Sequence, residues 1–521
     1  MLKEFLRRIL SNRGYVINRF DTGIPPTLAE ILEAIRQPSV MVCFDSEVRI
    51  QSEILAIFPP EQVQFVTPLP PPANGITGAG QPTPVAPSGP FAAVIDLAGS
   101  PLSALLARFP WLARAEVLLL RCPLGSFWSG EIDLCHLTSD LQKRGFGLED
   151  VIDLTVGPQL EAAFARPTFV FRPAGRPGTQ ARNSRYRVNE ALALLSTPIA
   201  QARDFRLLAS RGSHGFAGGV FNPGAIIVDD QVRLLCRTER YPWQQMKADE
   251  SLYFAATPAL LLSLGRNGEI TQTAELALSG LPDGPASRVE DFRLFQFRGE
   301  AYSNHSVISA SQPGAPTRGP LQLETMQTRV GVSRLDLRAG RLTWCGVPDL
   351  GRPLQRTEKN WAMFADNDRL FLLYSFSPYV LFASRNWPGL EFAPQREAQI
   401  ALPFSGDGLP VRNSINPVSY DSDHWLHLVH KVYPGKRYSF WAVLIDKKTL
   451  LPVRSTVRPV VHGWKSHPAA IIYTCAAIVR DTDVMLCAGV DDCGTAIATI
   501  SRERLDAEWV ALTPTETGSS K

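Results

Sequence analysis

The spacing of hydrophobic residues changes near residue 205 of this 521-residue chain. Before that point, in residues 91–172, short apolar runs alternate with segments whose apolar positions follow helical spacing. After it, helical spacing nearly vanishes, and short alternating runs are separated by turns rich in Asp, Asn, Gly and Pro. These periodicities predict an α/β region followed by an all-β region.

Stretches rich in Pro, Gly and polar residues mark the boundaries between the predicted regions. Within the α/β region we predict strands at residues 92–96, 115–120, 151–154 and 168–171, and helices at 102–109 and 132–144. The predicted parts are an N-terminal α/β segment (1–67), a linker (68–90), an α/β part (91–172), a connector (173–204) and an all-β part (205–521).

The all-β part repeats one pattern five times: a short polar motif, a turn, and a strand that ends in polar residues. The copies start at Phe221, Arg288, Glu358, Asn413 and Ile471, roughly 55–70 residues apart, which suits one four-stranded sheet with its loops. Closing five such sheets into a ring removes their open edges. We therefore predict a mainly β protein: a five-bladed β-propeller preceded by a small, incomplete Rossmann-like α/β domain.

In a propeller, equivalent strand ends converge on the central channel, so polar residues at the same point of each repeat are expected to meet. His427 is three positions from His430 and is expected to face the other side of its strand, so we leave it out. The set mixes carboxylates, which act in glycoside cleavage, with cations that bind phosphate. Its members are Arg237, Glu239, Asp291, Arg293, Lys359, His430, Lys431, Asp491 and Asp492.

Several of these motifs together resemble glycoside hydrolase family 130, which comprises β-mannoside phosphorylases, related hydrolases and related β-1,2-mannosyltransferase/phosphorylases. The motifs are Glu290-Asp-Phe-Arg293, Lys359-Asn-Trp361, His430 with Tyr438, and Gly489-Val-Asp-Asp492. The resemblance covers about 300 residues and implies the five-bladed fold. Phe292 stands where the family motif has proline, which is a departure at the centre of the candidate site.

The resemblance also implies roles for individual residues. Asp291 matches the general acid, and Asp492 matches a sugar-binding aspartate. The positions that match phosphate-binding residues are Arg237 or Arg240, Arg293, Lys359, His430 and Tyr438. We expect an inverting phosphorylase that joins or cleaves a β-mannoside-like bond, with phosphate or a sugar phosphate as co-substrate, an oligosaccharide or sugar phosphate as partner, and neither a metal nor another cofactor.

Two alternatives stay open at this point. Cations that suit free phosphate suit the phosphate of an activated donor equally well, which leaves a glycosyltransferase of polysaccharide assembly. The departure at Phe292 leaves a non-catalytic glycan-binding or scaffolding protein. The sequence leaves the sugar, its linkage and the oligomeric state open.

Residues 91–172 resemble the C-terminal half of an FkbM-type methyltransferase domain. The resemblance lies in residues 94–99, 115–121 and 137–154. Binding of S-adenosylmethionine in such a domain needs an early Gly-rich turn that lets the backbone approach the ligand closely. Residues 1–67 offer no such turn, so we expect an inactive relative with a structural or partner-binding role.

Charge and cysteine content narrow the class of protein further. The chain has 53 basic and 50 acidic residues, a balance that favours no nucleic-acid or membrane partner. Its eight cysteines show no CxxC spacing, which predicts neither a disulfide framework nor a cysteine zinc site and fits a cytoplasmic protein. We find no signal peptide and no run of about 18 uncharged apolar residues, so we predict no membrane span.

Overall fold

A computed structural model of the chain forms two compact units. One consists of Met1–Thr197 with Gly406–Gly408, and the other of Pro198–Ser405 with Leu409–Lys521. The structure describes residues 40–44, 63–66, 91–96, 107, 109–122, 134–152, 168–173, 197–255, 257–281, 287–310, 319–322, 326–404, 410–433, 437–463 and 471–516.

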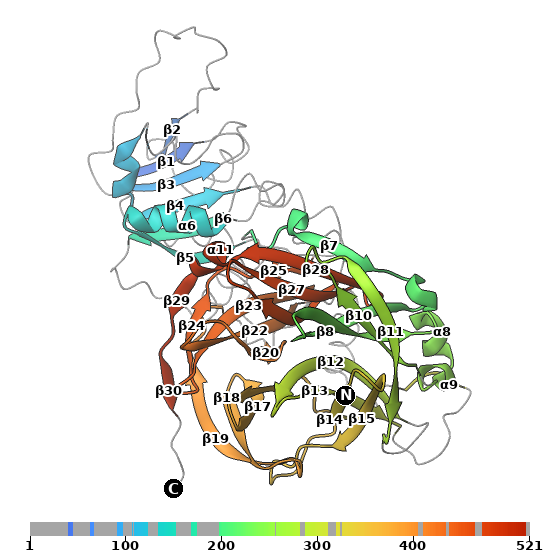
Figure 1. Ribbon diagram of the computed structural model, residues 1–521. Coiled ribbons are helices and arrows are strands. Elements are labelled where there is room, and N and C mark those ends of the chain that lie inside the picture. Colours follow the sequence, from blue (N-terminus) through green and yellow to red (C-terminus); the bar gives the residue numbers. More distant parts are fainter. Residues whose placement is uncertain are drawn as a thin grey trace, which may run out of the picture. The chain divides into compact units, whose positions relative to one another are not determined.

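The first unit is built on a six-stranded mixed sheet in the order β2-β1-β3-β4-β6-β5 (Figure 1). The first four strands of that order run parallel, whereas β6 is antiparallel to both of its neighbours. The elements are β1 (Val40–Phe44), β2 (Val63–Val66), β3 (Phe91–Asp96), η2 (Pro110–Arg114), β4 (Val117–Arg121), α6 (Leu134–Lys143), β5 (Phe146–Ile152) and β6 (Thr168–Pro173).

Burial explains why the sequence forms this sheet. Ala92–Ile95 of β3 and Val117–Leu120 of β4 are buried on both faces, as expected of parallel strands that are covered on each side. The predicted strands at 92–96, 115–120 and 168–171 and the predicted helix at 132–144 correspond to β3, β4, β6 and α6. The predicted strand at 151–154 overlaps only the end of β5, which starts at Phe146, and residues 153–154 lie outside the described residues. The predicted helix at 102–109 falls largely outside the described residues.

The second unit consists almost entirely of strands, which confirms a mainly β chain. Short helices lie between some of them: η4 (Ala202–Asp204), η5 (Ser213–Gly215), α8 (Trp243–Ala248), α9 (Glu250–Tyr253) and α11 (Arg502–Asp506). The strands of the first two sheets are β8 (Gly219–Val228), β9 (Gln231–Glu239), β10 (Ala259–Leu264) and β11 (Ile270–Ser279), then β12 (Ser287–Phe297), β13 (Glu300–Ser309), β14 (Gln327–Asp336) and β15 (Arg341–Gly346).

Three further sheets follow in chain order. The third holds β16 (Ala362–Asp366), β17 (Arg369–Phe376), β18 (Tyr379–Asn386) and β19 (Glu391–Ile400). The fourth holds β20 (Arg412–Asn413), β21 (Val418–Ser419), β22 (His424–Tyr433), β23 (Arg437–Asp446), β24 (Pro452–Thr456) and β25 (Val461–His462). The fifth holds β26 (Ile472–Val479), β27 (Asp483–Val490) and β28 (Gly494–Ser501), and it is completed by β7 (Phe205–Ala209) from the start of the unit.

The five sheets lie in succession around a common centre (Figure 1). Their first strands touch at that centre: β8 contacts β12 and β26, and β12 also contacts β16. The pairing of β7 with β28 joins the beginning of the unit to its last sheet, while β30 (Pro514–Glu516) and β29 (Trp509–Ala511) extend the third and fourth sheets. Parallel pairing of β11 with β15 links the first two sheets at their edges. The five successive sheets correspond to the five repeats found in the sequence.

Each of the five sequence repeats supplies the first strands of one sheet, and its polar motif lies on or directly beside the innermost strand. Apolar residues of neighbouring sheets pack between them, for example Leu428 of the fourth sheet with Leu486 of the fifth in one buried cluster. No helix within the described residues is long and apolar enough to span a membrane.

Candidate functional site

Two inner strands, β8 and β12, and the segment that leads into β16 each hold a short polar residue in an unusual backbone conformation. Asn222, Asp291 and Asn360 have φ angles of 51°, 57° and 63°. Asn and Asp adopt this left-handed region more readily than other non-glycine residues, because their short polar side chains bond locally. The ladder also shifts register next to Asn222 in β8 and next to Asp291 in β12. Such bulges redirect a side chain and are common beside functional sites.

At the bulge in β12, a hydrogen bond holds one oxygen of the Asp291 carboxylate in place. Oδ1 accepts a hydrogen bond from Nδ2 of Asn222 at 2.7 Å, and Nη1 of Arg237 lies 3.9 Å away. Among the described residues no hydrogen bond reaches Oδ2, and a quarter of the side chain is exposed. One oxygen is therefore held in place while the other is available to a ligand.

Next to Asp291, four largely buried charged residues form an ion cluster that consists of Arg237, Glu239, Arg288 and Glu290. Arg237 Nη2 lies 2.8 Å from Glu239 Oε1 and 2.7 Å from Glu290 Oε1. Arg288 pairs with the same two carboxylates, at 3.1 Å from Glu290, and its guanidinium stacks on the ring of Tyr253. Both glutamates of the cluster are therefore ion-paired with arginines.

Burial alone would lower the pKa of Arg237, but the carboxylates of Glu290, Glu239 and Asp291 outweigh it and raise that pKa. The guanidinium therefore stays charged. Burial, reinforced by Glu290, raises the pKa of Tyr253, so its hydroxyl stays neutral and donates to Glu290 Oε1 at 3.1 Å. The ion cluster fixes Glu290 and, through the chain, the strand position of the adjacent Asp291.

The guanidinium of Arg293 donates hydrogen bonds to other groups of the protein. Nε donates to the carbonyl oxygen of Ser414 at 2.6 Å, and Nη2 donates to Tyr473 Oη at 3.0 Å and to Asn360 Oδ1 at 3.2 Å. Nη1 lies 3.4 Å from the carbonyl oxygen of Asp291. Arg293 is 2% exposed. These bonds join Arg293 to residues of the fourth and fifth sheets and to Asn360, and the phosphate-binding role expected from the sequence stays a prediction.

His430 lies in a group of aromatic rings beside this junction. Its ring centroid is 5.3 Å from that of Tyr473 and 5.7 Å from that of Tyr438. Burial, followed by the charges of Arg293 and Arg412, holds the pKa of His430 well below its ordinary value. The imidazole is therefore neutral, and its buried Nδ1 has no hydrogen-bond partner within the described part of the chain.

Tyr438 lies near carboxylates and near an exposed arginine of the site. Burial, then Asp492 and Asp291, raise the pKa of its hydroxyl, while Arg412 opposes that effect. The phenol is neutral at ordinary pH. Asp492 lies with Asp491 in the left-handed turn between β27 and β28, where Asp491 Oδ1 accepts the backbone N–H of Ile471 at 2.8 Å.

Of the predicted site residues, the structure brings Asp291, Arg237, Arg293, His430 and Tyr438 into this group of interactions. Lys359 is exposed and precedes Asn360, and Arg240 is exposed directly after β9, where it joins none of the contacts described for the site. The expectation that Lys431 reaches the channel is wrong. Its Nζ donates to the carbonyl oxygen of Phe404, because adjacent residues of a strand face opposite sides.

Leaving out His427 was justified, since Nε2 of this buried residue pairs with Asn413 Oδ1 at 3.2 Å and its ring stacks on Phe376. Phe292, the departure from the family motif, is buried against His305, so a packed ring replaces proline in the bulge. Sequence reasoning missed Arg412. Its only signal was its place directly before the fourth polar motif.

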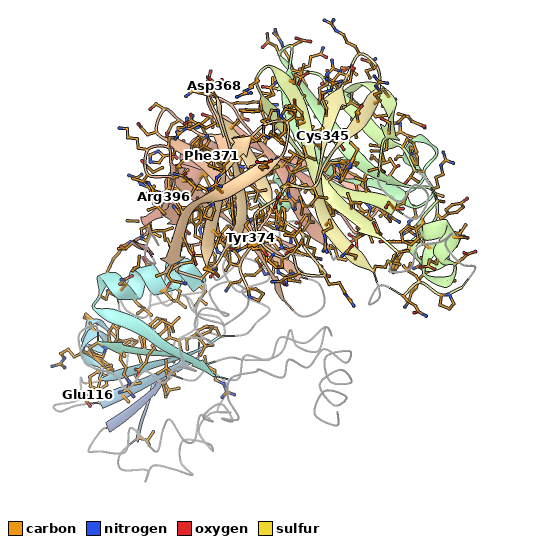
Figure 2. The ribbon with its side chains drawn as sticks, turned by 90° about the horizontal axis from the view of Figure 1, so that it is seen from below. Glu116, Cys345, Asp368, Phe371, Tyr374 and Arg396 are labelled. Atoms are coloured by element: carbon orange, nitrogen blue, oxygen red, sulfur yellow. The ribbon has the colours of Figure 1, made fainter. Side chains whose placement is uncertain are left out.

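Lys359 lies in the segment that leads into β16 of the third sheet. Its neighbour Glu358 is buried and accepts hydrogen bonds from Tyr374 Oη at 3.2 and 3.1 Å. Figure 2 labels Tyr374 on β17, with Asp368 at the turn that begins this strand. These hydrogen bonds anchor Glu358, whereas the adjacent Lys359 is exposed.

No family model matches the sequence, and no curated protein matches it. Solved structures with a similar fold include a β-1,2-mannobiose phosphorylase from Listeria innocua in complex with β-1,2-mannobiose. It is 15% identical, covers 58% of this chain and 97% of its own, and has a TM-score of 0.41. A mannose phosphorylase from Leishmania mexicana in complex with a phosphate ion is 12% identical, covers 60% of this chain and 92% of its own, and has a TM-score of 0.38.

A third similar structure is described as part of the GH130 family of mannoside phosphorylases, containing hydrolases that target β-1,2-mannosidic linkages in Candida mannan. It is 9% identical, covers 55% of this chain and 84% of its own, and has a TM-score of 0.39. At such identities and scores these similarities assign no role to any residue. The resemblance of residues 91–172 to FkbM-type methyltransferases finds no support in the comparisons.

Proposed function

We propose that the second unit is a carbohydrate-active enzyme that cleaves or forms a β-mannoside-like bond with inorganic phosphate, at the inner end of its strands. The observation that carries the proposal is the Asp291 carboxylate: a bulge directs it, Asn222 holds its Oδ1, and Oδ2 is open to a ligand. A positioned carboxyl group is what protonation of a glycosidic oxygen requires.

The ion pairs of Glu239 and Glu290 support phosphate, rather than a water molecule activated by a carboxylate, as the nucleophile. Hydrolysis with inversion needs a second carboxylate that activates water. Glu239 and Glu290 are both bound to Arg237 and Arg288 and are mostly buried, so neither is available for that role. A phosphate anion is already charged and needs no general base.

The proposed reaction has one displacement. Asp291 Oδ2 gives its proton to the glycosidic oxygen as the bond from that oxygen to the anomeric carbon breaks. A phosphate oxygen forms the new bond to the same carbon from the opposite face. The products are α-mannose 1-phosphate and a sugar with a new hydroxyl group, and the configuration at the anomeric carbon is inverted.

Purified protein incubated with β-mannobiose tests this function. We expect sugar release that depends on inorganic phosphate and is negligible in phosphate-free buffer. Release from GDP-mannose instead, with no action on β-mannobiose, would point to a glycosyltransferase. Binding of β-mannobiose without any release, in a folded sample, would leave glycan binding as the function of the unit.

Gly489, on β27 of the fifth sheet, offers a test of the Asn222–Asp291 contact. A Cβ atom at this position would lie 1.9 Å from Asn222 Oδ1 and 3.0 Å from its backbone nitrogen. Gly489→Ala must therefore displace Asn222 and release Asp291. Because misplacement of a reacting group by about 1 Å costs on the order of 10²-fold in rate, we expect kcat to fall by about that factor. Gly147→Ala, where a Cβ meets nothing within 4 Å, is the control; full activity of Gly489→Ala would contradict the positioning role.

For the first unit we propose a structural or partner-binding role. The support is its described sheet, in which parallel strands form an α/β core, together with the lack of an early Gly-rich turn in residues 1–67.

A further inference from the structure

The short helices α8 and α9 pack directly on the ion cluster. Arg288 Nη1 donates to the carbonyl oxygen of Tyr253 at 2.7 Å, and the Arg288 guanidinium lies 3.9 Å from the centre of the Tyr253 ring. Met246 of α8 and Tyr253 of α9 are buried in one apolar cluster with Ile308, which is directly opposite Arg288 in the β12–β13 pair. The helix pair is therefore fixed beside the first residues of β12, three positions before Asp291.

The first residue of α8, Trp243, exposes its indole to solvent. Among the described residues the exposed large apolar side chains are Leu207, Ile227 and Trp243, and Trp243, at 42% exposure, is the one aromatic ring of the three. Single exposed apolar residues are ordinary. Trp243 differs because its ring is held in one orientation, edge to face with Tyr253 at 6.4 Å between centroids and 72° between planes.

Tyr253 links this indole to the proposed general acid. Its hydroxyl donates to Glu290 Oε1 at 3.1 Å, and Glu290 directly precedes Asp291 in β12. One aromatic ring thus separates Trp243 from the acidic motif. A glycan whose scissile bond lies at Asp291 and which extends toward solvent has a further sugar unit within reach of the Trp243 ring.

Lys247 lies on the same face of α8 as Trp243, because residues four apart are neighbours on a helix surface. It is exposed, and within the described part of the chain no carboxylate lies at ion-pair distance from it. Its ammonium group offers three N–H donors. A sugar ring has one face of C–H groups and a rim of hydroxyl oxygens, so an open indole beside a cationic donor matches its chemistry.

We infer that Trp243, assisted by Lys247, binds an outer sugar unit of the glycan, beyond the two units that flank the bond broken at Asp291. This inference rests on the proposed function, whose substrate class it narrows to oligosaccharides of three or more units. Binding costs little order, because the Tyr253 contact already holds the indole in place.

Calorimetric titration in phosphate-free buffer, where phosphorolysis does not proceed, tests the inference. We expect the wild type to bind the trisaccharide β-mannotriose more tightly than β-mannobiose. In Trp243→Ala the Kd for β-mannotriose should rise roughly tenfold, the size of one lost aromatic contact, while the Kd for β-mannobiose stays the same. Trp243→Phe should be intermediate, and Lys247→Gln should lose less.

The matched control is Ile227→Ala. Ile227 is as exposed as Trp243, at 42%, but lies near the end of β8, so its replacement should leave both Kd values unchanged. An unchanged rate of β-mannobiose phosphorolysis in Trp243→Ala shows that the ion cluster and Asp291 are undisturbed.

Equal wild-type affinity for the two sugars, or wild-type affinity for β-mannotriose in Trp243→Ala, would overturn the inference. Loss of a dimer in Trp243→Ala by light scattering, with sugar binding intact, would assign the indole to contact between copies of the chain instead. If β-mannotriose binding depends on Trp243 but the wild type releases no sugar phosphate, the proposed function fails and the outer sugar site stands. If phosphorolysis proceeds with an unchanged KM for β-mannotriose in Trp243→Ala, the site fails and the function stands.

Discussion

Replacement of Asp291 by asparagine should lower kcat for phosphorolysis of β-mannobiose by about 10² to 10⁴-fold, the range that a positioned general acid supplies. Asparagine keeps the size of the side chain, still offers an oxygen to Asn222, and tolerates the left-handed backbone of this bulge. It cannot give up a proton. The melting temperature should therefore change little while turnover is lost, and a coupled assay for the sugar phosphate measures the effect.

A substrate with a good leaving group separates proton donation from a structural role. A nitrophenyl β-mannoside needs little protonation as its bond breaks, so Asp291→Asn should lose much less activity on it than on β-mannobiose. Asp230→Asn makes the same chemical change in an exposed left-handed turn and should leave both activities unchanged. Equal losses on both substrates would argue against the acid role.

The second large effect is expected on stability, from Arg288→Met in the ion cluster. The change leaves Glu239 and Glu290 buried with one guanidinium fewer and removes the cation that stacks on Tyr253 at 3.9 Å. Breaking a buried ion pair by removing one partner typically costs about 3–5 kcal/mol. We expect a loss of that size in the free energy of unfolding, measured by urea denaturation.

Arg334→Met is the matched control for that experiment. Arg334 pairs with Glu300 at 3.3 Å, but both side chains are about half exposed. Surface pairs of this kind contribute at most about 1 kcal/mol. Similar losses in the two variants would mean that burial of the ion cluster does not govern its contribution.

The repeating part of the fold was predictable because the sequence of each sheet contains the same local pattern. That pattern is a polar motif, a turn and a strand with alternating apolar residues. The pairing of β7 with β28 was not, since Phe205–Ala209 joins strands nearly 300 residues further along the chain. No local pattern encodes such a partner. The left-handed conformations of Asn222, Asp291 and Asn360 were likewise invisible, because the sequence shows polar residues at these points without showing their φ angles.

The candidate site was predictable as a set of residues and less so as a set of roles. The hydrogen bond from Arg293 to the main-chain oxygen of Ser414 could not be predicted, because a main-chain acceptor leaves no mark in the residue types. Lys431 is a different case. The strand alternation that set His427 aside applies equally to Lys431, the direct neighbour of His430, and would have excluded it. Arg412 emerges only from its register with His430.

The most direct test of the central claim is ³¹P NMR of wild-type protein with β-mannobiose and inorganic phosphate. Growth of the α-mannose 1-phosphate signal, absent with Asp291→Asn, is the predicted result, since direct attack by phosphate on a β-mannoside inverts the anomeric carbon. Formation of the β-anomer, or release of free mannose at the same rate without phosphate, would contradict it.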